Sequence, residues 1–177
     1  IKLLCFLLVS DISVTNMMNE YDLIGIDPGL KSTGYGIISI KRKKIFYKAS
    51  GKITTNPNDY ESERLREIFQ GLNEIVIKFK PYQAVVEKIF VNVNASSTLT
   101  LGQARGVAIA ALAGHQIEIH ELTPLEIKKS VVGTGKANKK QVQFMVKELL
   151  HLHRAPESDA SDALACAIAW HNKVKFQ

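Results

Sequence analysis

The chain has 177 residues, of which 46% are hydrophobic and 23% charged, and this composition is typical of one globular domain with a packed core. The formal net charge of +6 favours a polyanionic partner, either nucleic acid or an anionic membrane surface. The apolar run from Leu3 to Val9 is too short to cross a bilayer, which excludes a membrane span there.

The start of the chain is expected to lie outside the fold. Met17 comes just before the first strong strand pattern, so we interpret residues 1–17 as an N-terminal extension and residues 18–177 as a single domain. The apolar start faintly resembles a secretory signal, but no convincing small-residue cleavage site follows it. Cys5 and Cys166 are far apart in the sequence, which fits a reducing cytoplasm, and we expect the protein there.

Three strands are predicted at the beginning of the domain. Pro28, Gly29 and Gly34 break the chain between the first two strands, and a solvated turn at Lys41–Lys44 follows the second. Because short connections suit antiparallel neighbours, we expect a three-stranded meander. The predicted strands are Tyr21–Ile26, Tyr35–Ile40 and Ile45–Ile53.

A change of hydrophobic period marks a helix after the meander. Apolar residues recur at spacings of three and four from Leu65 to Phe79, and Pro81 ends the pattern. The short apolar run Ala84–Glu87 then suits a buried strand that is reached by a crossover connection. The remaining patterns predict a helix, a strand and three further helices, at Ser97–Ala113, Ile117–Leu122, Pro124–Val132, Lys139–Leu150 and Ser158–Trp170.

The order of these elements, βββαβαβ followed by helices, predicts an α/β fold. An antiparallel meander combined with parallel crossovers is most economically one five-stranded mixed sheet with helices on both faces. If the first crossover returns to the first strand, strands one and four lie side by side, and their ends become close neighbours.

Four acidic residues stand at positions that this fold would bring together. Asp27 follows the first strand, Glu87 ends the fourth, and Asp159 and Asp162 project to one face at the start of the last helix. Each also has an ordinary structural explanation: a turn residue, a strand that reaches solvent, or acids favoured by the helix dipole. The combination favours a site, because open α/β sheets place their ligands at such strand ends.

Carboxylates that share one pocket raise one another's pKa unless cations neutralise them. Mg²⁺ prefers oxygen ligands, and paired ions clamp a phosphodiester displacement. The positive charge of the chain is also local, because Ile127–Lys147 contains no acidic residue and six lysines, a number equal to the whole net charge: Lys128, Lys129, Lys136, Lys139, Lys140 and Lys147. A basic chain with an acidic pocket suggests nuclease chemistry.

With these residues assembled, the chain resembles the RuvC family of Holliday junction resolvases, part of the ribonuclease H-like superfamily. The resemblance runs from about Asp22 to Trp170 and is carried, in order, by IGIDPGLKSTGYGII, VVEKIF, LGQARGVAIA, VVGTGKANKKQVQ and SDASDALACAIA. It implies an endonuclease that resolves four-way DNA junctions by paired nicks in recombination and repair, leaving a 5′-phosphate and a 3′-hydroxyl.

The resemblance also implies a role for each acidic residue. Asp27, Glu87, Asp159 and Asp162 match the four catalytic positions that hold two Mg²⁺ ions, or Mn²⁺ in their place. Some relatives carry histidine where Asp159 stands, so the role of this residue could differ.

The resemblance also implies that basic and aromatic residues hold the DNA. Lys128 and Lys139 match positions that support catalysis, with a solvated basic face as the alternative explanation. Phe90 matches an aromatic that stacks on bases of the opened junction, with core packing as the alternative. The full set of expected DNA contacts is Phe90, Arg105, Lys128, Lys129, Lys136, Lys139 and Lys140.

The family forms homodimers, which suits a two-fold symmetric junction, and the resemblance implies the RuvA and RuvB branch-migration proteins as partners. Gly102, Gly106 and Ala110 recur every four residues on the second predicted helix. This spacing fits close packing on the sheet as well as it fits a subunit interface.

Other signals are set aside. Gly133–Lys136 resembles a phosphate loop, but Ser130 replaces its first glycine and Ala137 its final Ser or Thr. The five histidines lack zinc spacing and are interpreted as surface residues.

Two rival functions remain. A non-catalytic junction-binding protein should have lost some of the four acidic residues, and this chain keeps all four. An actin-like-fold phosphotransferase needs a second such domain, for which 177 residues leave no room.

Overall fold

The computed structural model describes residues 20–90 and 95–175, so the expected extension at residues 1–17 lies outside the described residues. None of the described helices combines the length and apolar character that a membrane crossing requires. The elements are, in order, β1 (Glu20–Asp27), β2 (Ser32–Lys41), β3 (Lys44–Thr54), α2 (Glu61–Phe79), β4 (Gln83–Glu87), α3 (Ala95–Gly114), β5 (Glu118–Leu122), α4 (Pro124–Val132), α5 (Lys139–Leu149) and α6 (Ser158–Lys175).

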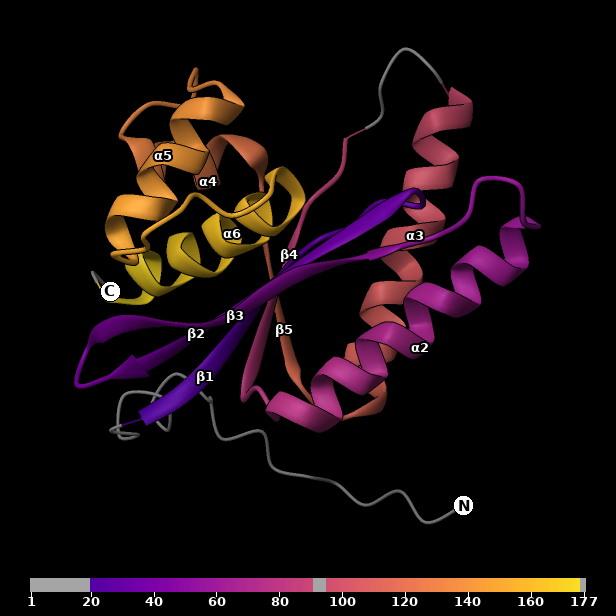
Figure 1. The fold of residues 1–177 in the computed structure, drawn as a ribbon, viewed down its shortest axis with the longest axis horizontal. Coiled ribbons are helices and arrows are strands. Elements are labelled where there is room, and N and C mark those ends of the chain that lie inside the picture. The colour runs from indigo at the N-terminus through magenta and orange to yellow at the C-terminus, as the bar shows by residue number, and fades with distance from the viewer. Residues whose placement is uncertain (1–19, 91–94, 176–177) are drawn as a thin grey trace.

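The described strands form one mixed sheet in the order β3-β2-β1-β4-β5 (Figure 1). The β1–β2 and β2–β3 pairs are antiparallel, and the β1–β4 and β4–β5 pairs are parallel. Arg42 and Lys43 form the tip of the β2–β3 hairpin with φ angles of 49° and 65°, the conformation that a tight hairpin turn needs. The predicted five-stranded mixed sheet, with strands one and four adjacent, is confirmed.

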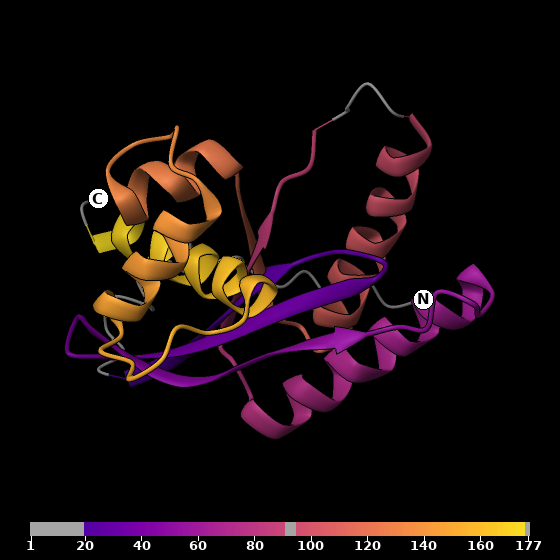
Figure 2. The ribbon, with the colours of Figure 1, turned by 45° about the horizontal axis from the view of Figure 1, so that its top comes forward.

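Helices cover both faces of the sheet, as predicted. Figures 1 and 2 show α4, α5 and α6 on one side and α2 and α3 on the other. Adjacent residues of β1 serve opposite faces: Leu23 packs into the core under α6, and Ile24 packs into the core under α2 and α3. Each face therefore has its own apolar core.

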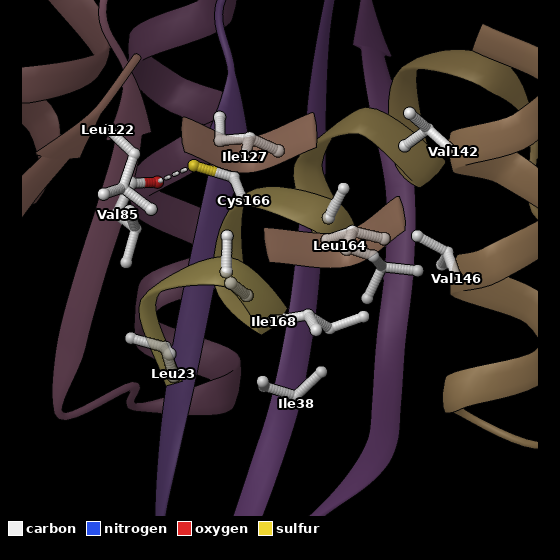
Figure 3. Packing of buried hydrophobic residues seen from close by; sticks show 14 of the residues in the cluster. Leu23, Ile38, Val85, Leu122, Ile127, Val142, Val146, Leu164, Cys166 and Ile168 are labelled. Atoms are coloured by element: carbon white, nitrogen blue, oxygen red, sulfur yellow. Dashed lines mark hydrogen bonds between the residues drawn. The ribbon is translucent and has the colours of Figure 1, made fainter. Parts of the chain in front are cut away.

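Helix α6 packs unusually close to the sheet. A side chain at Gly25 would overlap the backbone of Ala163, and one at Gly36 would overlap the backbone of Leu164. Cys166 is fully buried in this contact, and its thiol points to the carbonyl of Val85 at 3.6 Å (Figure 3). The cysteine behaves as the small apolar residue that the sequence predicted.

Three expectations require correction. Strand β2 begins at Ser32 because Gly34 is not a break but pairs with both Asp27 and Lys52. Helix α6 continues past the predicted end to Lys175, since no Gly or Pro follows to stop it. The prediction that all histidines lie on the surface is wrong for His171 of α6, which is buried.

Candidate metal centre

The first acidic residue, Asp27, ends β1 where the chain turns sharply. The hydroxyl of Thr33 donates to the carbonyl of Gly29 at 2.8 Å and accepts from the Gly29 N–H at 3.3 Å. The hydroxyl of Thr55 donates to the carbonyl of Leu30 at 2.6 Å. Both threonines are buried, so the turn that follows Asp27 is fixed from two sides.

The second acidic residue, Glu87, ends the neighbouring strand. The pairing of β1 with β4 runs to Ile26 opposite Val86, so Asp27 and Glu87 come next in sequence on two adjacent parallel strands. Their carboxyl groups leave the sheet at the same edge, where α/β sheets bind ligands. This placement agrees with the arrangement predicted from the sequence.

Helix α6 brings the two remaining acidic residues to this edge. Asp159 is in its first turn, close enough that a side chain at Gly34 would overlap its backbone. Asp162 follows one turn later, and its Oδ2 accepts a hydrogen bond from Lys139 Nζ at 3.1 Å. The close packing of α6 on β1 and β2 therefore decides where these carboxylates lie.

A cavity of about 200 Å³ joins three of these acids. Its lining mixes carboxylates and ammonium groups with an apolar floor, and comprises Asp27, Glu87, Pro124, Ile127, Lys128, Lys139, Val142, Asp162 and Ala165. Asp159 does not line the cavity, although its charge still acts on Asp27 and Lys139. The structure thus places Asp159 at the margin and the other three acids around one hollow.

The electrostatics show that the carboxylates interact. Burial, together with the charges of Glu87 and Asp162, raises the pKa of Asp27 to about 7. Burial and the charge of Asp162 also raise the pKa of Glu87, against the opposing effect of Lys139 and Lys128. The cavity therefore resists accumulating negative charge without an added cation.

The donor set suits a hard divalent cation, because the cavity offers carboxylate oxygens and no thiolate or imidazole. As they stand, however, no three His, Cys, Asp or Glu side chains in residues 20–90 and 95–175 are close enough to surround one ion. The hydrogen bond from Lys139 already occupies an oxygen of Asp162. The chemistry of the residues fits metal binding, and the carboxylates would have to draw together around the ions.

The basic and aromatic residues named from the sequence occupy different surroundings. Lys128 lines the cavity, and the exposed lysines of α4, the following loop and α5 are Lys129, Lys136, Lys139 and Lys140. Phe90 follows Glu87 by three residues and is 60% exposed, so core packing does not explain it. An exposed aromatic ring three residues after a carboxylate of the cavity is available to stack on a base.

Arg105, which was expected to contact DNA, has partners inside the protein. Its Nε donates to the carbonyl of Glu87 at 3.2 Å, and its guanidinium forms an ion pair with Glu121 on β5. No local sequence pattern indicates this role, because Arg105 and Glu87 are 18 residues apart.

Other contributors to the site also escaped sequence reasoning. Thr33 lies four residues after Gly29, a spacing that suits a local side-chain hydrogen bond and could have suggested its role. Lys52 on β3 pairs with Glu157 at 2.7 Å and is influenced by the charge of Asp159. The pairing of β2 with β3 brings Lys52 to this edge of the sheet, so no local sequence pattern predicts its position there.

Comparison with known proteins identifies close relatives. Residues 23–170 match the sequence model of a family described as crossover junction endodeoxyribonuclease RuvC. The protein of that name from Dechloromonas aromatica is 52% identical over 147 residues, which cover 83% of this chain and 82% of the relative. Its counterpart from Neisseria meningitidis serogroup C is 49% identical over 146 residues, covering 82% of both chains.

Solved structures give the same result. The structure of T. thermophilus RuvC in complex with a Holliday junction substrate superposes with a TM-score of 0.78 at 28% sequence identity. The match covers 84% of this chain and 92% of that one.

Proposed function

The chain belongs to the RuvC family of crossover junction endodeoxyribonucleases, and we propose that it cuts DNA at the cavity between Asp27, Glu87 and Asp162. It is a hydrolase of phosphodiester bonds that acts on four-way junctions in recombination and repair. The observation that carries the site proposal is that these three carboxylates share one cavity with Lys128 and Lys139.

We propose that the acidic residues hold two Mg²⁺ ions, and that Mn²⁺ can replace them. Asp27, Glu87 and Asp162 would be the main ligands, with Asp159 contributing from the margin of the site. Bound ions would supply Lewis-acid stabilisation of the phosphodiester and an activated water. The raised pKa of Asp27 supports this proposal, because a bound cation would offset both the burial and the carboxylate repulsion that keep the proton on the carboxyl group.

Lys128 and Lys139 would hold the scissile phosphate. Both line the cavity, and their charges already lower the pKa of Glu87 against the effect of burial. An ammonium group beside the phosphate offsets the negative charge that develops as the bond breaks. The side chain of Lys139 is 73% exposed, so it can reach a bound strand without leaving an apolar environment.

The surrounding surface would hold the arms of the junction. The exposed lysines Lys129, Lys136 and Lys140 would contact phosphates, which provides affinity without sequence preference. Phe90 would stack on a base next to the cut, compensating for the unstacking that opens the junction.

A homodimer would match the symmetry of the substrate. Two copies related by a two-fold axis would present two sites to the two-fold symmetric junction and make paired nicks. We also propose that RuvA and RuvB proteins deliver the junction, and that the enzyme works on chromosomal DNA in the cytoplasm.

The function is tested by incubating the protein with a four-way junction, a linear duplex of the same sequence and an RNA/DNA hybrid, with and without Mg²⁺. We expect paired nicks in the junction alone and only with Mg²⁺. Asp27→Asn should still bind the junction but not cut it. Cleavage of the hybrid, or hydrolysis of a nucleotide, would overturn the proposal.

A further inference from the structure

The peptide group between Glu87 and Lys88 is held at both of its polar atoms. The Lys88 N–H donates to the carbonyl of Leu122 at 2.8 Å, which extends the β4–β5 pairing. The Glu87 carbonyl lies beyond the last β1–β4 pair, Ile26 with Val86, and accepts instead from Arg105 Nε at 3.2 Å. The main chain just after Glu87 is therefore held both by β5 and by a residue of α3.

Arg105 is itself held in place by a second contact. Its guanidinium pairs with the carboxylate of Glu121, which lies opposite Val86 on the neighbouring strand β5. The two side chains are partly buried, at 20% and 36% exposure, so water competes with this pair less than with a surface ion pair. One guanidinium thus connects α3, the end of β4 and β5 through two differently directed N–H groups.

Arg105 does not act on the Glu87 carboxylate through its charge. The cations that act on the Glu87 carboxylate are Lys139 and Lys128, which line the cavity. Arg105 is absent from that lining and contacts the Glu87 main chain. Its contribution is geometric, and a lysine would not reproduce it because an ammonium group lacks the planar fork.

We infer that Arg105 is a positioning residue for Glu87, and that the Arg105–Glu121 pair sets the metal-binding geometry of this carboxylate instead of contacting DNA. The inference rests on the proposed function in that Glu87 is taken as a metal ligand. Groups that orient a ligand from behind commonly alter metal affinity or activity 10- to 100-fold, and we expect roughly this range here.

The test uses Arg105→Lys, which keeps the charge, and Glu121→Gln, which keeps the shape of the acid. For Arg105→Lys we expect Mn²⁺ affinity, measured by calorimetry without DNA, to fall roughly tenfold. Turnover of saturating junction should fall roughly 10- to 100-fold, whereas the junction dissociation constant without metal should change less than about twofold. Glu121→Gln should show the same pattern with smaller losses, and it provides the test if Arg105→Lys fails to fold.

A double-variant comparison separates positioning from general loss of structure. In a Glu87→Gln background, Arg105→Lys should cause no further loss of Mn²⁺ affinity, because the two residues act through one carboxylate. The matched control is Lys78→Gln, which alters a cation at the distant end of α2 and should change neither metal affinity nor turnover.

Two results would overturn the inference. One is unchanged Mn²⁺ affinity in both Arg105→Lys and Glu121→Gln. The other is weaker junction binding by Arg105→Lys, together with a slope of log affinity against log salt concentration that is smaller by about one. That result would make Arg105 a phosphate contact. Failure of the wild-type protein to cut junctions would instead contradict the proposed function, and the calorimetric result would still decide whether Arg105 positions Glu87.

Discussion

Lys139 Nζ lies 3.1 Å from Asp162 Oδ2 and thereby connects the first residue of α5 to helix α6 across the cavity. The hydrogen bond and the charge of Asp162 raise the pKa of Lys139. The ammonium group consequently stays protonated at neutral pH. Lys139 is therefore suited to hold and neutralise a phosphate, and it is not suited to accept a proton.

The first prediction concerns this lysine. Lys139→Gln should lower turnover of saturating four-way junction by roughly 10- to 100-fold, because it removes a cation next to the reacting phosphate. Lys139→Arg should retain most activity, with an unchanged shape of the pH–rate profile. Single-turnover cleavage measured across pH checks both. Lys147→Gln, on the last turn of the same helix, serves as the control, and an altered profile in Lys139→Arg would show that Lys139 transfers a proton.

The second prediction follows from the pKa of Asp27, which burial and neighbouring carboxylates raise to about 7. The ordinary pKa of this carboxyl group is 3.8, so as the pH rises the unfolded chain loses the proton at a lower pH than the folded protein does. Without metal, the contribution of Asp27 to stability is complete below about pH 4 and is lost as the pH rises through about 7. Asp27→Asn should therefore unfold at a higher temperature than the wild type at pH 8 in EDTA, and the difference should shrink at pH 5 and vanish below about pH 4.

Added Mg²⁺ supplies the control for this comparison. It should raise the unfolding temperature of the wild-type protein at pH 8, because an ion that binds only the folded state stabilises it. The same addition should have much less effect on Asp27→Asn. A variant that is less stable than the wild type at pH 8 in EDTA would contradict the claim that the Asp27 charge is costly to bury.

The sequence predicted the sheet because each strand carries a local signal. Alternating or continuous apolar runs, separated by turn residues, are enough to place β1 to β5, and crossover rules then put β1 beside β4. The start of β2 was misjudged because a glycine normally suggests a break. Gly34 instead provides room for the backbone of Asp159, a contact between residues far apart in the chain that local patterns do not reveal.

The candidate site shows the same division between local and long-range information. The placement of Asp27 and Glu87 at one edge of the sheet was predictable because each stands at the end of a recognisable strand. The role of Arg105 was not predictable, since its contacts to Glu87 and Glu121 depend on how α3 lies against the sheet. An arginine in a basic chain is naturally interpreted as a DNA contact, and only the structure reveals its internal partners.

The third prediction tests the close packing of α6. Gly25→Ala should destabilise the protein by about 1–3 kcal/mol, because the new methyl group would overlap the backbone of Ala163 and push the helix away from the sheet. Cleavage activity should fall more than the fraction of folded protein does, because Asp162 moves with α6. Urea denaturation and cleavage at a temperature where the variant remains folded separate the two effects. Gly114→Ala, where nothing lies within 4 Å of the added methyl, should be close to neutral.

The fourth prediction concerns Phe90, whose ring is 60% exposed and three residues from Glu87. Phe90→Ala should lower turnover while leaving metal binding intact, because stacking on an opened base contributes about 1–3 kcal/mol. Phe90→Tyr should keep most activity, since it preserves the aromatic face. A fluorescent base analogue beside the cut reports unstacking directly, and its signal on binding should fall for Phe90→Ala. The matched control is Phe69→Ala, which removes a 43% exposed ring from α2. Equal losses in the two alanine variants would mean that an exposed aromatic supports the fold and does not open the junction.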